Sequence, residues 1–363
     1  MQELVILILL IGEYNMYENL KFAPALPFVQ TKDVQEAIRI ASDITVESVN
    51  IKLEDIKINT DATINYGRNK NITEFGFENL CKLLGIPKPF AQKIPVDLLF
   101  QNIKRLQTDK AALEISLLMR PDDSIANIVK SPYNESSYLD VLSNFSDRID
   151  LKYINIGERL LTICLAFEDM KLSKDEDDVL YLGTYVYNSI VREMKLSMFS
   201  GLYRITCENS LIAPFLGTFK ASYTQKEEIR LLRFVENIRC YENNIFSNIE
   251  KNFRGFDSRF LYEYEMLKIW GDMDRLVGEM DADLVLNTNP EDRKVLQENV
   301  RAWKSTNARE KLVGRSVIEA PVTNVLAYDA INAITNHAKS LSGIERRDVE
   351  KVGGKLLQYF ILN

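Results

Sequence analysis

Histidine and recognisable catalytic motifs are almost absent from this sequence. His337 is the single histidine among 363 residues, so catalysis of the Ser–His–Asp or Cys–His type would have to use that residue. No HExxH sequence, no pair of histidine ligands and no cysteine cluster occurs, which argues against a zinc site. Neither GxxxxGKS/T nor GxGxxG occurs, which argues against ATP-driven function. We therefore expect no metal and no cofactor and assign no catalytic residue. A catalytic pair of carboxylates that the fold brings together remains an open alternative.

Cysteine is also scarce. The four cysteines are at least 33 residues apart, which excludes metal or redox motifs of the CxxC type. Two of them lie among apolar residues, where a free cysteine behaves as a small hydrophobic side chain. We expect reduced, structural cysteines at Cys81, Cys164, Cys207 and Cys240.

Long hydrophobic runs are missing. The apolar run Leu4–Ile11 has eight residues, whereas a membrane-spanning helix needs about 20. The run also lacks the basic region and the small-residue cleavage site of a secretory signal peptide. We expect it to form a buried or edge strand, and we expect a cytoplasmic protein with no membrane partner.

The composition is that of a folded, acidic protein. Hydrophobic residues make up 46% and charged residues 27% of the chain, which is normal for globular proteins. The formal net charge is −7, which argues against coating nucleic acid by bulk charge. A local basic groove stays open, because binding depends on the local field.

The pattern along the chain predicts an α+β fold. Apolar residues alternate with polar ones around Val49, Ile51 and Leu53, which indicates half-buried strands. Helices are expected at Ile72–Leu84, with Thr73 near its start, and at Val96–Gln107; strands are expected near residues 113–119 and 126–130.

Three regions follow from this pattern. Residues 1–145 are expected to form an N-terminal α+β region, and residues 146–220 an antiparallel β-meander of three or four strands. Residues 221–363 are expected to be mainly helical and to form one compact unit with the meander. Within it, the stretch Lys226–Trp270 fits one long helix or two packed ones, and helices are expected at Glu291–Ser305 and Asn324–Ser340.

One stretch is strongly basic within this acidic chain. Between residues 293 and 315, seven cations are opposed by two glutamates, which gives a net charge of +5 around Trp303. Cations beside an aromatic ring can hold a phosphate backbone and stack a base, although a solvated helix face fits the same pattern. The predicted nucleic-acid-binding residues are Arg293, Lys294, Arg301, Trp303, Lys304, Arg309, Lys311 and Arg315.

A second polar group lies in the strand-rich region. Arg204 and Asn209 occur within or just after an apolar strand, and each would need hydrogen-bond partners if buried. A structural hydrogen-bond network that closes the sheet is the simpler interpretation of these two residues.

Four segments in order resemble a known family. They are LCKLLGIP at residues 80–87, IVKSPY at 128–133, YNS at 187–189 with LYRITCEN at 202–209, and AINAIT at 330–335. Together they are similar to the domain-of-unknown-function family 932, a group of phage- and plasmid-like proteins. The resemblance implies a phage or plasmid origin, hence host-cell cytoplasm, and leaves function open. It implies structural roles for Asn188, Arg204, Asn209 and Asn332.

Two function classes follow. The order of strands and then a long helix resembles the core of phage single-strand annealing proteins, which bind DNA as rings or filaments without ATP or metal; this is an analogy of fold alone. The leading hypothesis is thus a non-enzymatic accessory protein, homo-oligomeric and binding single-stranded DNA in recombination or annealing. The alternative is binding to a host or phage protein, as a virion component or an inhibitor of host defence, which the acidic charge favours.

Overall fold

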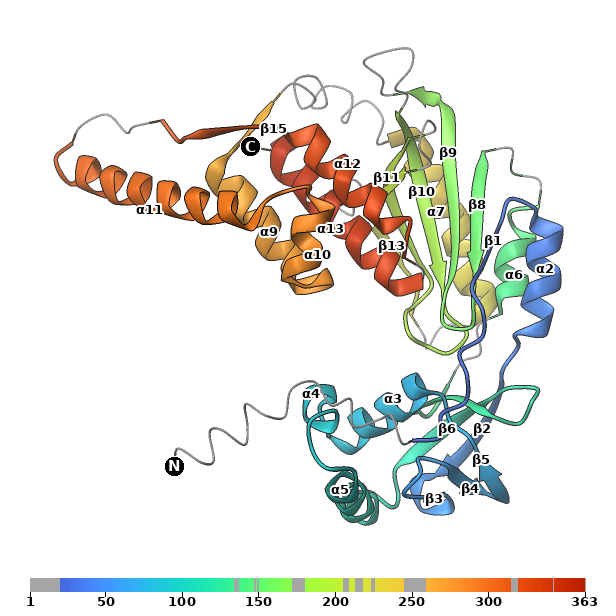
Figure 1. Cartoon of the computed structure of the whole chain (residues 1–363). Helices are drawn as coiled ribbons and strands as arrows, with labels where there is room; N and C mark the ends of the chain where they lie inside the picture. The colour runs from blue at the N-terminus through green and yellow to red at the C-terminus, as the bar shows by residue number, and fades with distance from the viewer. Residues whose placement is uncertain are drawn as a thin grey trace, which may run out of the picture.

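The computed structural model shows an α+β protein with two lobes, and the predicted fold class is confirmed. The larger lobe is built on a seven-stranded sheet, and the smaller lobe lies below it in Figure 1. The run Leu4–Ile11 lies outside the described part of the chain. The structure describes residues 20–133, 137–146, 148, 150–171, 180–204, 209–212, 218–222, 226–244, 259–314, 319–341 and 343–362.

Seven antiparallel strands form the centre of the larger lobe. The strand order is β1-β8-β9-β10-β11-β12, and β13 pairs with β11 on the same edge as β12. Strands β8 to β12 are neighbours in the order of the chain, which is the antiparallel meander that the sequence predicts. The strands are β1 Val29–Thr31, β8 Leu151–Ile156, β9 Leu161–Lys171, β10 Leu180–Asn188, β11 Ser197–Arg204, β12 Asn209–Ile212 and β13 Thr218–Lys220.

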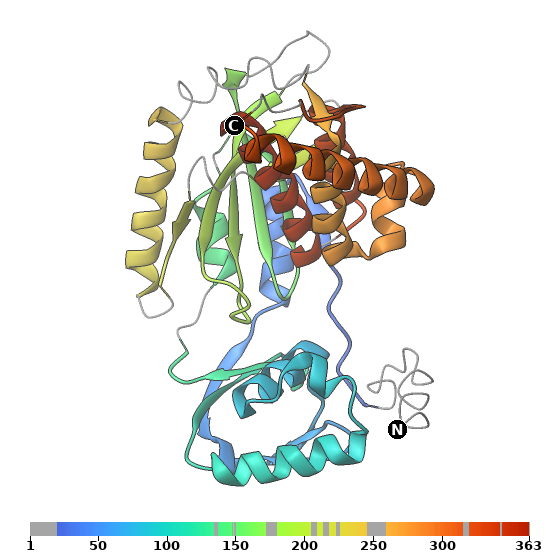
Figure 2. The ribbon, with the colours of Figure 1, turned by 90° about the vertical axis from the view of Figure 1, so that its left-hand side faces the viewer.

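The two faces of this sheet pack against different helices, because strand residues point alternately to opposite sides. Ile163 of β9 belongs to a core shared with α2, α6 and α7. Its neighbour Cys164 belongs to a core rich in tyrosine that α13 covers. Figures 1 and 2 show the sheet between these two helical layers. The helices are α2 Val34–Asp43, α6 Tyr138–Ser143, α7 Glu227–Asn244 and α13 Gly343–Leu362.

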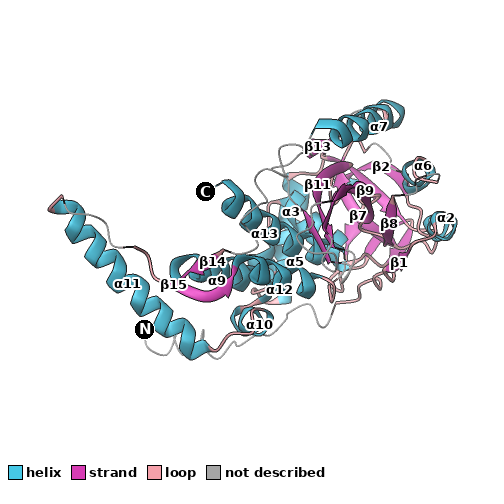
Figure 3. Ribbon diagram, turned by 90° about the horizontal axis from the view of Figure 1, so that it is seen from above, coloured by secondary structure: helices cyan, strands magenta, loops and turns pink. Residues whose placement is uncertain are grey.

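The remaining C-terminal elements extend away from the sheet. α9, α12 and α13 share a core that includes Leu182 and Leu202 of the sheet, and β14 pairs with β15. The expected stretch Lys226–Trp270 thus holds α7 and the start of α9, with β14 before α9. Figures 1 and 3 show that α11 extends beyond the rest of the lobe at its C-terminal end. The elements are β14 Phe260–Tyr262, α9 Glu263–Val277, α10 Glu279–Val285, α11 Pro290–Leu312, β15 Val322–Leu326 and α12 Ala327–Ala338.

The smaller lobe has its own core of three helices and two three-stranded sheets. Helix α3 begins after Thr73, whose side chain accepts a hydrogen bond from the N–H of Gly76, as the expected cap near that position would do. The sheets have the orders β2-β6-β7 and β3-β4-β5. The elements are β2 Glu47–Lys52, η2 Leu53–Asp55, β3 Lys57–Ile58, β4 Ile64–Tyr66, β5 Arg68–Lys70, α3 Glu74–Leu84, α4 Lys88–Ala91, α5 Val96–Asp109, β6 Glu114–Met119 and β7 Ile125–Lys130.

The chain passes between the lobes three times. Residues 20–23 pack on the smaller lobe, β1 and α2 belong to the larger one, β2 to β7 return to the smaller one, and α6 is again in the larger one. The expected N-terminal region 1–145 therefore contributes to both lobes. Its expected boundary lies close to the end of α6, and the helices after residue 220 share their core with the meander.

Candidate nucleic-acid interface

α11 carries the cations that the sequence predicts as a binding surface. The side chain of Asn289 accepts a hydrogen bond from the N–H of Glu291 at 3.0 Å, and Pro290 occupies the first turn. Acidic residues occupy the first turn and basic residues the last, where each sign is favoured by the helix dipole. These signals explain why one 23-residue helix forms, and it continues seven residues beyond the expected end at Ser305.

Arg293 lies on the side of α11 that packs against the larger lobe. Its guanidinium forms a two-bonded ion pair with Asp274, and carboxylate oxygens of Glu279 and Asp283 each lie 3.7 Å away. The hydrogen bonds that Arg293 donates to Asp274 raise the pKa of Arg293, so it stays charged while its charge is balanced inside the protein. It also lies 5.3 Å from the ring centroid of Trp270. Arg293 therefore belongs to the packing of α11 and is not available to a ligand.

Trp303 also packs against the larger lobe, where one face of its ring stacks on Tyr264. Its ring is 5.6 Å from the ring of Tyr264 at an interplanar angle of 10°, and Tyr264 stacks in turn on Tyr262 at 5.6 Å and 7°. Burial raises the pKa of the Tyr264 hydroxyl, which keeps it neutral. The three rings fix α11 against α9, which is a structural use of Trp303 that differs from the predicted base stacking.

Four of the predicted cations on α11 are exposed to solvent. Lys294, Arg301, Lys304 and Lys311 occur at positions i, i+7, i+10 and i+17, which places them within an arc of about 100° on a helix of 3.6 residues per turn. Arg309 is also exposed, outside this arc. None of these five side chains forms an ion pair with a residue that the structure describes. We call these five residues the α11 stripe.

The remaining predicted residues are placed as follows. Arg315 lies outside the described residues, as do the side chains of Arg204 and Asn209, whose backbones pair with each other across β11 and β12. Asn188 is fully buried at the end of β10, a position compatible with a structural role. The carbonyl oxygen of Asn332 accepts a hydrogen bond from Thr335 within α12.

A cavity of about 520 Å³ lies beside the first turns of α11, away from the stripe. Trp270 lines it and donates from Nε1 to the hydroxyl of Thr288 at 3.1 Å. Its ionisable lining residues are Glu263 and Asp292, which disfavour a phosphate. We therefore do not include this cavity in the candidate interface.

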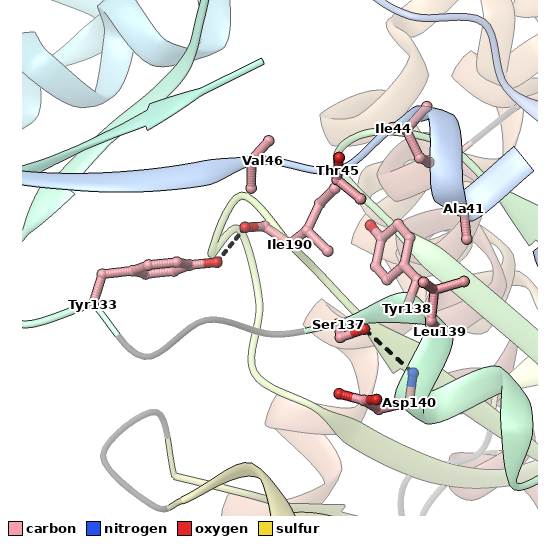
Figure 4. Close-up of a pocket in the computed structure, with 10 residues that line it drawn as sticks. All are labelled: Ala41, Ile44, Thr45, Val46, Tyr133, Ser137, Tyr138, Leu139, Asp140 and Ile190. Carbon is pink, nitrogen blue, oxygen red and sulfur yellow. Dashed lines mark hydrogen bonds between the residues drawn. The ribbon is translucent and has the colours of Figure 1, made fainter. Parts of the chain in front are cut away.

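A second cavity of about 320 Å³ lies where the chain passes between the lobes (Figure 4). In Figure 4 the hydroxyl of Tyr133 donates to the carbonyl oxygen of Ile190, and the hydroxyl of Ser137 accepts from the N–H of Asp140. Its lining is largely apolar and contains no lysine or arginine among the described residues. It is therefore chemically distinct from a polyanion site.

A further group of cations was not among the predicted residues. Arg347, Lys351 and Lys355 recur every four residues on α13, a spacing that was visible in the sequence once that segment is helical. The sequence pattern gave no equivalent reason to connect Lys220 of β13 with them, because that contact is made by the fold.

Comparison with known proteins does not indicate a family or a function for this chain. No family model, no curated protein and no solved structure matches the chain. Within the described residues, no three histidine, cysteine or acidic side chains gather as metal ligands. None of the described helices has both the length and the hydrophobicity of a membrane span.

Proposed function

We propose that this protein binds single-stranded nucleic acid along the α11 stripe. The observation that carries the proposal is that five cations lie exposed on one helix without a described ion-pair partner. Exposed cations without a carboxylate partner keep their full attraction for phosphate, which supplies most of the affinity of non-specific nucleic-acid binding.

The dimensions of the stripe suit one strand of a polynucleotide. Lys294 and Lys311 are 17 residues apart, which corresponds to about 26 Å at 1.5 Å per residue. That distance spans about eight phosphates at the roughly 3.4 Å spacing of one strand in a duplex. Four of the cations lie within an arc of about 100° along α11 and can follow one phosphate backbone, whereas a duplex presents two backbones across a groove.

The charge of the rest of the chain favours a local contact. The chain carries a formal net charge of −7, so a polyanion is repelled by most of the surface and attracted to α11. Trp303 contributes by holding the helix in place through Tyr264, while phosphate contacts provide binding that does not depend on sequence.

The direct test measures fluorescence anisotropy of a labelled oligo-dT with Arg301→Glu/Lys304→Glu. Both side chains are exposed, so we expect the variant to fold normally and to bind at least tenfold more weakly at low salt. The matched control is Lys104→Glu/Arg105→Glu, which makes the same charge change on exposed residues of α5 in the smaller lobe. Equal binding by the two variants would show that the contact does not use α11.

A protein-interaction role is the second candidate, and exposed apolar side chains favour it. Leu312 and Val313 at the projecting end of α11 are 87% and 66% exposed, and Met280 and Leu284 on α10 are 87% and 80% exposed. Exposed apolar clusters of this kind mark association surfaces. The end of α11 is basic, whereas α10 is acidic, so the two are complementary in charge as well.

The partner that this complementarity favours is a second copy of the chain. α11 is about 34 Å long, so its C-terminal end cannot reach α10, which precedes its N-terminal end, in the same molecule. Contact between copies would be head-to-tail and would produce a ring or an open filament. Such an assembly would align several α11 stripes along one strand, which is the setting that recombination or annealing by a phage-type accessory protein would need.

A further inference from the structure

A second group of cations lies between α13 and the edge of the large sheet. Arg347, Lys351 and Lys355 follow one another at intervals of four residues, so their side chains lie on the same side of α13. The ammonium of Lys351 is 5.3 Å from the ring centroid of Phe199 in β11. This side of α13 therefore faces the sheet.

The register of the strands brings a fourth cation to the same place. Lys220 of β13 is paired directly with Ser197 of β11, and paired residues of an antiparallel sheet lie on the same face. Ser197 and Phe199 are two residues apart and also share a face. Lys220 therefore lies on the face that α13 covers, in the row of paired residues next to that of Phe199. Its side chain is exposed.

Within the part of the chain that the structure describes, carboxylates balance only part of the charge of this group. Asp348 accepts from Arg347 at 3.0 and 2.8 Å and lies 3.8 Å from Lys351. Of the other two acidic residues of α13, Glu350 is buried and accepts from Arg346 at 2.9 Å, and Glu345 lies exposed in the first turn. Among the described residues, Asp348 is thus the one carboxylate that pairs with these four cations, and each ammonium is repelled by its neighbours.

The effect of this repulsion is concentrated on Lys351. Burial, together with the charges of Arg347, Lys220 and Lys355 and against the opposing charge of Asp348, lowers the pKa of Lys351 to about 8. A bound anion would relieve the repulsion and favour the charged ammonium.

A buried hydroxyl in the same row lacks a partner. Tyr187 of β10 is paired with Ser197, so Tyr187, Ser197 and Lys220 form one row across three strands. Tyr187 is 1% exposed, and its hydroxyl has no hydrogen-bond partner among the described residues. A buried hydroxyl without a partner is unfavourable, and an anion or its bound water would satisfy it.

We propose that Lys220, Arg347, Lys351 and Lys355 form a site for a phosphoryl anion, with the Tyr187 hydroxyl beneath it. The guanidinium supplies paired, planar donors and the lysines supply point charges, which together suit the oxygens of a phosphate. Two sources present this chemistry, the phosphates of a polynucleotide and a free polyphosphate. The site is separate from the α11 stripe and does not depend on it.

The test follows Lys351 by NMR of ¹³C-dimethylated lysines in the full chain. The protein carries Arg301→Glu/Lys304→Glu, so that failure of the α11 proposal does not affect the result. Inorganic tripolyphosphate and an unlabelled oligo-dT are added in separate titrations. We expect the pKa of Lys351 to rise from about 8 towards the usual 10.5 with at least one of them.

The two ligands distinguish the sources, and a second lysine is the control. A response to tripolyphosphate identifies a free polyphosphate, and a response to oligo-dT alone identifies a polynucleotide. Lys268, which lies 4.3 Å from the ring centroid of Tyr359, should not respond. A Lys351 pKa unchanged by both ligands would overturn the proposal.

A binding measurement provides the second readout. Lys220→Met removes an exposed cation and should preserve the fold, and we expect it to weaken the responding ligand by about tenfold, the usual scale for one charge-assisted hydrogen bond. Lys339→Met, at the exposed end of α12, makes the same change away from the site. Equal affinity of these two variants would also count against the proposal.

Discussion

Arg120 of the smaller lobe and Glu158 of the larger lobe form a two-bonded ion pair in which both side chains are buried. Nε and Nη2 of Arg120 donate to the two carboxylate oxygens of Glu158, and the residues are 5% and 6% exposed. Nη1 of Arg120 also donates to the carbonyl oxygen of Pro24 at 2.9 Å, in the first passage between the lobes. A buried charge is strongly unfavourable without its partner. Moving the two lobes apart would separate this pair, so the pair stabilises their relative position.

Breaking the pair from one side should strongly destabilise the protein. Glu158→Gln leaves the guanidinium of Arg120 buried without its counter-charge, so we expect the free energy of unfolding to fall by about 3–5 kcal/mol. Urea denaturation measures this change. Replacing both residues with apolar ones, as Arg120→Met/Glu158→Leu, should recover much of the loss because no charge is then left unpaired.

An exposed ion pair of the same lobe provides the comparison. Arg68 donates to Asp123, and the Arg68 side chain is 72% exposed. We expect Arg68→Ala to change the free energy of unfolding by less than about 1 kcal/mol, since solvent screens such pairs. If Glu158→Gln were as mild as this change, the buried pair would have no special role in joining the lobes.

The α11 proposal predicts a definite dependence on salt. Five cations that each neutralise one phosphate give a slope of about −3.5 for the logarithm of the binding constant against that of the salt concentration, at about −0.7 per contact. Between 50 and 200 mM salt, binding to oligo-dT should therefore weaken by about 100-fold. Removal of two contacts by Arg301→Ala/Lys304→Ala should reduce the slope to about −2. A slope near zero in the unmodified protein would contradict a phosphate-based contact.

The sequence predicts the elements of this fold better than their partners. The cap at Thr73 and the alternation in the meander are local signals, and both lead to the observed α3 and to adjacent strands. The three passages between the lobes depend on which cores the elements join, and no local signal reports that. On α7, Ile229 and Leu232 are 43% and 60% exposed, while Phe234 and Arg230 are buried, so the helix packs on a side that the apolar residues alone do not indicate.

The same distinction applies to the binding residues. The excess of cations on α11 could be read from the sequence, and the helical period then places four of them within an arc of about 100°. That Arg293 is held by Asp274, and that Trp303 stacks on Tyr264, depends on how α9 packs against α11. Lys220 and Lys351 are 131 residues apart in the sequence, so only the register of β13 and the packing of α13 connect them.

Head-to-tail association predicts an unusual result when two variants are mixed. Leu312→Asp/Val313→Asp removes the projecting apolar end, and Met280→Asp/Leu284→Asp removes the surface on α10. Each variant alone should sediment as a monomer in the absence of nucleic acid. Mixed together they should form a one-to-one dimer, because one retains an intact α10 surface and the other an intact α11 end.

The matched control for this experiment lies on α7. Ile229→Asp/Leu232→Asp introduces the same charges at exposed apolar residues far along the chain from α10 and α11, and it should leave the association of the protein unchanged. A mixture of the α10 and α11 variants that stays monomeric, while the unmodified protein associates, would show that the contact is of another kind.

The low pKa of Lys351 makes stability depend on pH in a direction that can be checked. Burial, with the charges of Arg347, Lys220 and Lys355, lowers the pKa of Lys351 to about 8, below the usual 10.5, against the opposing charge of Asp348. Between these values the unfolded chain binds more protons at this lysine than the folded one, so its contribution to stability rises with pH from about 8 to about 10.5. Below about pH 8 the full unfavourable effect of the charged ammonium remains.

Lys351→Met removes this effect and keeps the length of the side chain over Phe199. We therefore expect the variant to exceed the unmodified protein in free energy of unfolding at pH 7, and to exceed it by less at pH 9.5. Other titrating groups contribute equally to both proteins, so they cancel in the difference between them. Urea denaturation at the two pH values measures that difference, and the same difference at both would show that repulsion around Lys351 does not act on the folded state.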